Sequence, residues 1–186
     1  MKKRIVLFIS LALLIVLVLH RMIPFIISTV HRIMTPPSVE DVESFVTENW
    51  NDISVVNDYL LELGDRDAYI SDNRGSILID LDHEKIEDYA VMQSVQSLWK
   101  KGCYSIYKNR EWNSISYSLW HRTMGGVGCG FEYAIDHTLL PEVQYQTELV
   151  PLSEEGWYYY LREYEKWRSQ QGSEQPTVNY PPVKRK

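Results

Sequence analysis

The sequence predicts an α+β protein that is attached to a membrane through its N-terminus. Three observations predict this fold class. An apolar run near the N-terminus contains no polar stripe that could face water. Apolar residues then recur at helical spacing, and after Gly102 they alternate with polar residues with a period of two. We therefore expect one or two helices packed on one face of a curved antiparallel sheet.

Residues 1–35 are predicted to form a membrane anchor. Three basic residues at positions 2–4 precede the 15 residues 5–19, in which one serine is the only polar side chain. As a helix this run is about 22 Å long, whereas the hydrocarbon layer of a membrane is roughly 30 Å thick. We therefore expect the transmembrane helix to continue to about residue 27. Two alternatives stay open. The span is shorter and a segment lies in the membrane interface, or the run is a cleaved secretory signal, although no small-residue cleavage site follows it.

The charges on either side of the apolar run predict its orientation. The basic residues 2–4 and the free amino terminus precede it, whereas Arg21 and Arg32 follow. Because basic residues are retained in the cytoplasm, we expect a single-pass signal-anchor protein of the cell membrane with a cytoplasmic N-terminus. The rest of the chain is then extracytoplasmic.

Residues 36–170 are long enough for one domain, and this domain is acidic. It holds 11 Lys and Arg against 24 Asp and Glu, a formal charge of −13. Such a surface repels phosphate, which argues against nucleic acid as a partner. The remaining segment, 171–186, is rich in Gly, Ser, Gln and Pro and is predicted to be a disordered tail.

Helical spacing predicts one long helix that begins after a Ser38 cap and ends at Gly64. Two short strands, 68–71 and 76–80, are expected next, joined by a turn. A second helix is expected from about residue 83 to Gly102.

The alternation after Gly102 predicts strands. In residues 113–121 apolar side chains alternate with serines, which is typical of a strand with one face in water: Ile115, Tyr117 and Leu119 against Ser114, Ser116 and Ser118. Neighbouring runs at 104–106 and 129–135 alternate in the same sense and complete a meander. A fourth strand is expected at 143–149, whereas residues 157–167 fit either a fifth strand or a helix.

This order of elements is typical of a roll, of the kind seen in cystatin-like and nuclear-transport-factor-like folds. The analogy rests on element order alone and implies no function.

Cys103 and Cys129 are the only cysteines, and an extracytoplasmic domain permits a disulfide between them. The predicted register argues against it, because it places the two side chains on opposite faces of strands roughly 10 Å apart, against about 7 Å for a bridge. The same register sets His121 opposite Cys129, which makes these two residues candidates for a thiolate nucleophile and its base. The simpler interpretation, a core cysteine and a histidine at a strand end, is favoured because no third orienting group is evident.

An acidic cluster that includes Asp80, Asp82 and Glu84 offers candidate metal ligands. It lacks the spacing of a calcium loop, and an acidic first helical turn capped by Asp82 explains most of it. We therefore predict no metal site and no cofactor.

Aromatic side chains supply the candidate binding residues. Trp112 lies in a predicted turn, Trp120 lies on the serine-bearing face, and Tyr158 and Tyr160 are candidates for outward-facing side chains. Exposed Trp and Tyr near acids are typical of sites for proteins, peptides or sugars. The alternative is that they are scattered surface aromatics or contact lipid headgroups.

Taken together, these patterns favour a membrane-anchored, outward-facing acidic domain that acts as a binding or interaction module and not as an enzyme. The expected partners are the membrane, through the N-terminal helix, and a protein, peptide or glycan. A cysteine-dependent or metal-dependent envelope enzyme is the competing class.

Overall fold

The computed structural model describes residues 35–71, 76–80, 82–122, 126–141 and 145–170. The chain divides into two units, Met1–Pro37 and Ser38–Lys186. The predicted transmembrane helix and the predicted tail lie outside the described residues. Among the helices that are described, none is long and apolar enough to cross a membrane.

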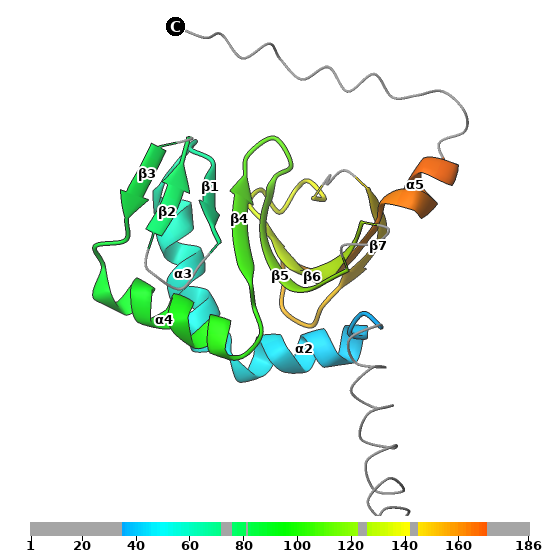
Figure 1. Ribbon diagram of the computed structural model, residues 1–186, viewed down its shortest axis with the longest axis horizontal. Helices are drawn as coiled ribbons and strands as arrows, with labels where there is room; N and C mark the ends of the chain where they lie inside the picture. Colours follow the sequence, from blue (N-terminus) through cyan, green and yellow to red (C-terminus); the bar gives the residue numbers. More distant parts are fainter. Residues whose placement is uncertain (1–34, 72–75, 81, 123–125, 142–144, 171–186) are drawn as a thin grey trace, which may run out of the picture. The chain divides into compact units, whose positions relative to one another are not determined.

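The α+β class is confirmed: the described residues form four helices and an open sheet of eight antiparallel strands (Figure 1). The helices are α2 (Val39–Glu48), α3 (Trp50–Glu62), α4 (Tyr89–Lys100) and α5 (Tyr164–Gln170). The strands are β1 (Ala68–Ile70), β2 (Ser76–Ile79), β3 (Asp82–Lys85), β4 (Ser105–Asn109), β5 (Ser114–Arg122), β6 (Val127–Ala134), β7 (Gln146–Pro151) and β8 (Trp157–Glu163). Their order in the sheet is β3-β2-β1-β4-β5-β6-β8-β7.

The prediction of one long helix up to Gly64 was wrong in one respect, because two helices, α2 and α3, occupy this stretch. The break lies at Asn49, whose backbone is not helical (φ −117°, ψ 13°) and whose side-chain amide donates to the Phe45 carbonyl at 2.7 Å. The side-chain hydrogen bond of such an asparagine competes with the backbone hydrogen bonds of a continuous helix. A break of one residue does not change the spacing of the apolar residues, so this spacing did not predict it. Both predicted ends are confirmed: Ser38 forms a capping box with Asp41, and Gly64 follows α3 with φ +63°.

The second helix is shorter than predicted. Residues 82–85 form β3, which pairs with β2, so Asp82 is not a helix cap. The cap is Asp88, whose Oδ1 accepts from the backbone N–H groups of Ala90 at 2.7 Å and Val91 at 3.2 Å. Strand pairing with β2 outweighs the helical pattern that the sequence shows around residue 83.

The predicted meander is confirmed as β4, β5 and β6. The ambiguous stretch 157–167 contains both predicted alternatives in succession, since β8 runs to Glu163 and α5 begins at Tyr164. The predicted fourth strand corresponds to β7, which begins at Gln146; residues 142–144 lie outside the described part of the chain.

The core lies between the helices and one sheet face, here called the helix face. Phe45 of α2 contacts Phe131 with ring centroids 5.9 Å apart, and Trp50 of α3 contacts Trp157 at 5.8 Å. Tyr117, which is fully buried, stacks on Phe131 at 4.7 Å. These contacts place β5, β6 and β8 directly against α2 and α3.

Cys103 and Cys129 are both buried in this core, and no disulfide joins them. The prediction that they point to opposite faces was wrong. Cys103 precedes the first residue of β4, so the alternation of that strand does not govern its direction.

Candidate functional site

The sheet face opposite the helices, here called the polar face, carries a row of side chains at matching register positions. Pairing aligns Leu78 of β2 with Tyr69 of β1 and Tyr107 of β4, and then with Ser116, Glu132 and Tyr158 of β5, β6 and β8. Neighbouring rows add Asn109, Ser114, Ser118, Tyr160 and Arg162. These rows connect residues that lie far apart in the sequence.

The polar face is not in water along β5, which corrects the prediction of a wet serine face. Ser114 is 0% exposed and Ser116 is 2% exposed. The strands from β4 to β7 follow a strong curve (Figure 1). In addition, the Asn113 side chain holds the segment after β6, because its amide donates to the carbonyls of Asp136 at 2.8 Å and Leu139 at 3.0 Å.

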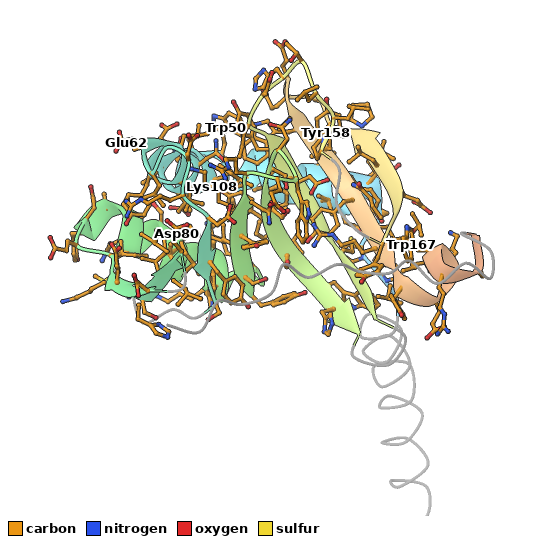
Figure 2. All side chains as sticks on the ribbon, turned by 90° about the horizontal axis from the view of Figure 1, so that it is seen from above. Trp50, Glu62, Asp80, Lys108, Tyr158 and Trp167 are labelled. Carbon is orange, nitrogen blue, oxygen red and sulfur yellow. The ribbon has the colours of Figure 1, made fainter. Side chains whose placement is uncertain are left out.

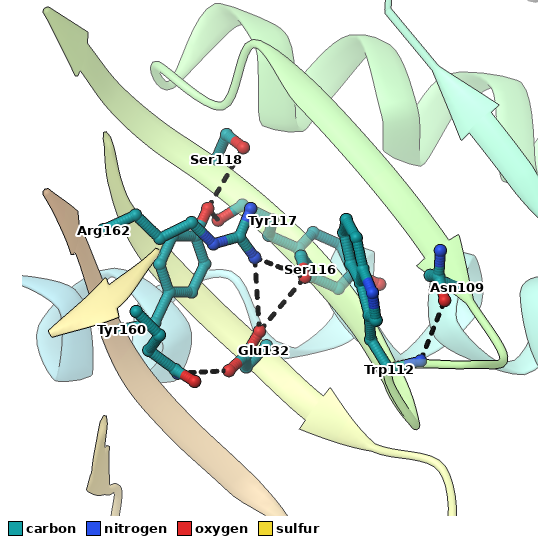
Figure 3. Close-up of polar contacts among 9 residues, drawn as sticks. Asn109, Trp112, Ser116, Tyr117, Ser118, Glu132, Tyr160 and Arg162 are labelled. Carbon is teal, nitrogen blue, oxygen red and sulfur yellow. Dashed lines mark hydrogen bonds and ion pairs between the residues drawn. The ribbon is translucent and has the colours of Figure 1, made fainter. Parts of the chain in front are cut away.

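The enclosed part of the polar face contains a buried carboxylate, Glu132, which is 0% exposed (Figure 3). Its Oε2 accepts from Ser116 Oγ at 3.1 Å and from Arg162 Nη2 at 3.5 Å, and its Oε1 accepts from Gln146 Nε2 at 2.9 Å. Burial raises the pKa of Glu132, and the charge and hydrogen bonds of these partners oppose that shift only in part. We call these four residues, together with Tyr160, the Glu132 cluster.

Arg162 links the Glu132 cluster to an aromatic ring. Its guanidinium carbon lies 4.2 Å from the ring centroid of Tyr160, a cation–π arrangement. The Tyr160 hydroxyl in turn lies 3.1 Å from Ser118 Oγ. Because the donors and acceptors of the cluster largely satisfy one another, it fixes the side chains of four strands, β5 to β8, in place.

The open part of the polar face lies over β1, β2 and β4. A pocket of about 270 Å³ is lined there by Asp67, Ala68, Tyr69, Leu78, Asp80 and Tyr107, and we call it the Tyr69 pocket. Tyr69 is 40% exposed, and its ring meets that of Tyr107 edge to face with centroids 6.0 Å apart. Figure 2 shows Asp80, at this pocket, well separated from Tyr158. The two parts of the polar face are therefore distinct in exposure and in position.

Three of the four aromatic candidates lie on the polar face or beside it. Trp112 joins the open part, because its ring contacts Tyr107 at 5.7 Å and its backbone N–H donates to Asn109 Oδ1 at 2.8 Å. Tyr158 shares a row with Glu132, and Tyr160 is buried in the Glu132 cluster, so Tyr160 does not face water as predicted.

Trp120 lies on the helix face, contrary to prediction. The pairing of β5 with β6 shifts by one residue between Ser118 and Trp120, which sets Trp120 opposite the core residue Cys129. Trp120 packs against the core cluster. A bulge of this kind exchanges the faces of every residue beyond it.

The same bulge separates the candidate nucleophile from its candidate base. His121 pairs with Gly128 and not with Cys129, so the predicted register was wrong by one residue. Burial raises the pKa of the Cys129 thiol to about 11, which favours the protonated thiol at neutral pH. The structure thus does not assemble a Cys129 and His121 pair on one sheet face.

The three acidic candidates are placed separately. Asp80 follows β2 and its Oδ1 accepts from the Asp67 N–H at 3.1 Å, Asp82 begins β3, and Glu84 pairs with Arg66 at 3.6 Å. Within the described ranges, no group of three or more His, Cys, Asp or Glu side chains is arranged to hold a metal ion.

Four residues that characterise the polar face were not predicted from the sequence: Tyr69, Tyr107, Glu132 and Arg162. A signal for two of them was present, since Tyr107 and Glu132 occupy the alternate positions of their strands that share a face with Ser116. Tyr69 had no such signal, because the pairing of β1 with β4 joins segments separated by a helix.

Comparisons of the chain with protein-family models, with curated proteins and with solved structures find no match.

Proposed function

We propose that this chain is a single-pass membrane protein whose acidic domain faces away from the cytoplasm and binds a partner without catalysing a reaction. The binding site in this proposal is the Tyr69 pocket with Trp112 at its side. The observation that carries the proposal is the pocket itself, in which partly exposed aromatic rings and carboxylates lie together on a sheet face. Aromatic side chains with a polar border are enriched where proteins bind partners.

The rigidity of the surrounding sheet supports a binding role. Tyr107 and Trp112 are held by ring contacts and by the bonds of Asn109, whose amide donates to the Tyr107 hydroxyl at 2.9 Å. A preformed site loses little conformational freedom when it binds.

The competing proposal of a cysteine-dependent enzyme has less support. A thiolate nucleophile requires a lowered pKa and an accessible sulfur, whereas burial raises the pKa of Cys129 and of Cys103. Both side chains belong to the hydrophobic core.

Membrane attachment in this proposal rests on the sequence. The apolar run at residues 5–19 and the preceding basic residues support a cytoplasmic N-terminus, which places the Tyr69 pocket outside the cytoplasm.

Site-specific photocrosslinking in native membranes tests the binding role. A photoreactive amino acid replaces Tyr69 in one variant and Tyr89, which is 67% exposed at the start of α4, in a matched control. We expect discrete adducts from position 69 that are absent from position 89. Identical adduct patterns from the two positions would refute the assignment of the Tyr69 pocket as the binding site.

A further inference from the structure

The Tyr69 pocket presents two carboxylates that are oriented by hydrogen bonds to the backbone. Asp67 Oδ1 accepts from the Arg110 N–H at 3.0 Å, and Asp80 Oδ1 accepts from the Asp67 N–H at 3.1 Å. Each carboxylate thus uses one oxygen to hold the backbone. Neither forms a salt bridge with any residue in the described part of the chain.

The nearest lysine does not fill the pocket. Lys108 is 2% exposed and its ammonium group donates to the Leu60 carbonyl at 2.9 Å and to the Gly64 carbonyl, at the end of α3. Its side chain is therefore on the helix face, whereas Tyr107 and Tyr69 are on the polar face. Arg66, another basic residue of this region, pairs with Glu84.

Two tyrosine rings beside two carboxylates favour a cation of a particular shape. An aromatic ring attracts a cation through its π-system, and a carboxylate forms strong charge-assisted hydrogen bonds with a guanidinium group. The guanidinium group is planar and weakly hydrated, so it suits such a site better than the compact lysine ammonium. The charge of −13 on residues 36–170 also attracts a cation and discriminates against an anion.

We infer that the Tyr69 pocket receives the guanidinium group of an arginine side chain from a partner polypeptide, with Asp67 and Asp80 as its acceptors and Tyr69 and Tyr107 as its aromatic wall. This inference rests on the proposed binding function and names the chemistry of the ligand.

The test uses the full-length protein in detergent micelles, with 3-fluorotyrosine at position 69 as a fluorine NMR reporter. The probe is a blocked Gly-Arg-Gly tripeptide, and its control is the same peptide with citrulline, which keeps the shape of arginine and lacks the charge. We expect a saturable shift of the fluorine resonance with the arginine peptide and at least tenfold weaker binding of the citrulline peptide.

A double variant tests the two acceptors. Asp67→Asn with Asp80→Asn keeps an oxygen for each backbone N–H and removes both charges, and we expect at least tenfold weaker binding of the arginine peptide. The matched control, Glu154→Gln with Glu155→Gln, removes two exposed charges in the turn before β8 and is expected to change binding less than twofold.

Several outcomes would overturn the inference. These are equal binding of the citrulline peptide, equal binding by the Asp67 and Asp80 variant, or no saturable shift with the arginine peptide. A comparable shift with maltotriose would assign the pocket to neutral sugars. Binding of the arginine peptide that appears only after the basic residues 184–186 are replaced would show that these residues of the same chain occupy the pocket.

The photocrosslinking experiment separates this inference from the proposed function. Discrete adducts at position 69 that survive the Asp67 and Asp80 replacements would leave the binding role standing and remove arginine as its ligand. Adducts that do not differ between positions 69 and 89 would remove the binding role itself.

Discussion

The Glu132 side chain illustrates how a single residue depends on the strands around it. In the sequence it is one acid among 25, and only the pairing of β6 with β5 and β8 makes it a buried carboxylate beside Arg162. The environment of Ser116 also depends on the neighbouring strands. The alternation of β5 predicts a surface residue, but its hydroxyl is buried and bonded to Glu132, so its replacement by Tyr is expected to destabilise the domain.

The raised pKa of Glu132 predicts a specific pH dependence of stability. From the ordinary carboxyl value of 4.5 upward, the unfolded chain loses its Glu132 proton before the folded chain does, so the free energy of unfolding falls as pH rises. For one proton this slope is at most about 1.4 kcal/mol per pH unit. We expect the stability of the wild type relative to Glu132→Gln to decrease as pH rises from 4.5 through the raised pKa of the folded state. Urea unfolding of both proteins at a series of pH values measures this difference, and a difference that stays constant or grows would contradict it.

For helices and strands, the sequence predicts the type of an element and the residue at which it ends better than it predicts a break or a bulge within the element. Gly64 and Gly102 mark the ends of α3 and α4 correctly, because each takes a positive φ that favours glycine. The break at Asn49 and the bulge after Ser118 leave the hydrophobic pattern unchanged, so neither was predictable from it. The bulge alone accounts for the wrong faces of Trp120 and His121.

The start of α4 gives a direct test at this scale. Replacing Asp88 by Ala removes two side-chain bonds to the first turn and is expected to cost about 1 kcal/mol of unfolding free energy. Replacing Asp82, the cap expected from the sequence, is expected to change it by less than about 0.5 kcal/mol, since its side chain is exposed on β3. Thermal unfolding followed by circular dichroism distinguishes the two; a larger loss for Asp82 would mean that the helix begins where the sequence predicted.

The close approach of β5 and β6 gives a second test. A Cβ atom at Gly130 would collide with the Tyr117 carbonyl and lie 2.9 Å from the Tyr160 hydroxyl, whereas one at Gly128 would lie 3.9 Å from the nearest atom, the Trp120 carbonyl oxygen. We expect Gly130→Ala to cost more than about 3 kcal/mol and Gly128→Ala less than about 1 kcal/mol. Similar urea midpoints for the two variants would show that β5 and β6 do not approach this closely.

For the molecule as a whole, location is a prediction that the sequence makes and the described residues do not address. The basic residues 2–4 predict that a reporter active only outside the cytoplasm is active when it is fused after Gln170. The protein is also expected to retain its N-terminus. An inactive fusion would reverse the orientation, and a mature protein that starts beyond Arg21 would show a cleaved signal.

The order of strands has a consequence for how the domain folds. Most ladders join strands that are neighbours in the sequence, and β1 with β4 is the pairing that must close a loop across β2, β3 and α4. Closing that loop costs chain entropy before the contacts of β1 compensate for it. The meander of β4, β5 and β6 is therefore expected to form first, and the hairpins of β1, β2 and β3 are expected to dock on it last. The same hairpins should open most easily in the native state. Hydrogen exchange at the backbone amides of Ala68 and Ile70 is then expected to be faster than at those of Tyr117 and Phe131.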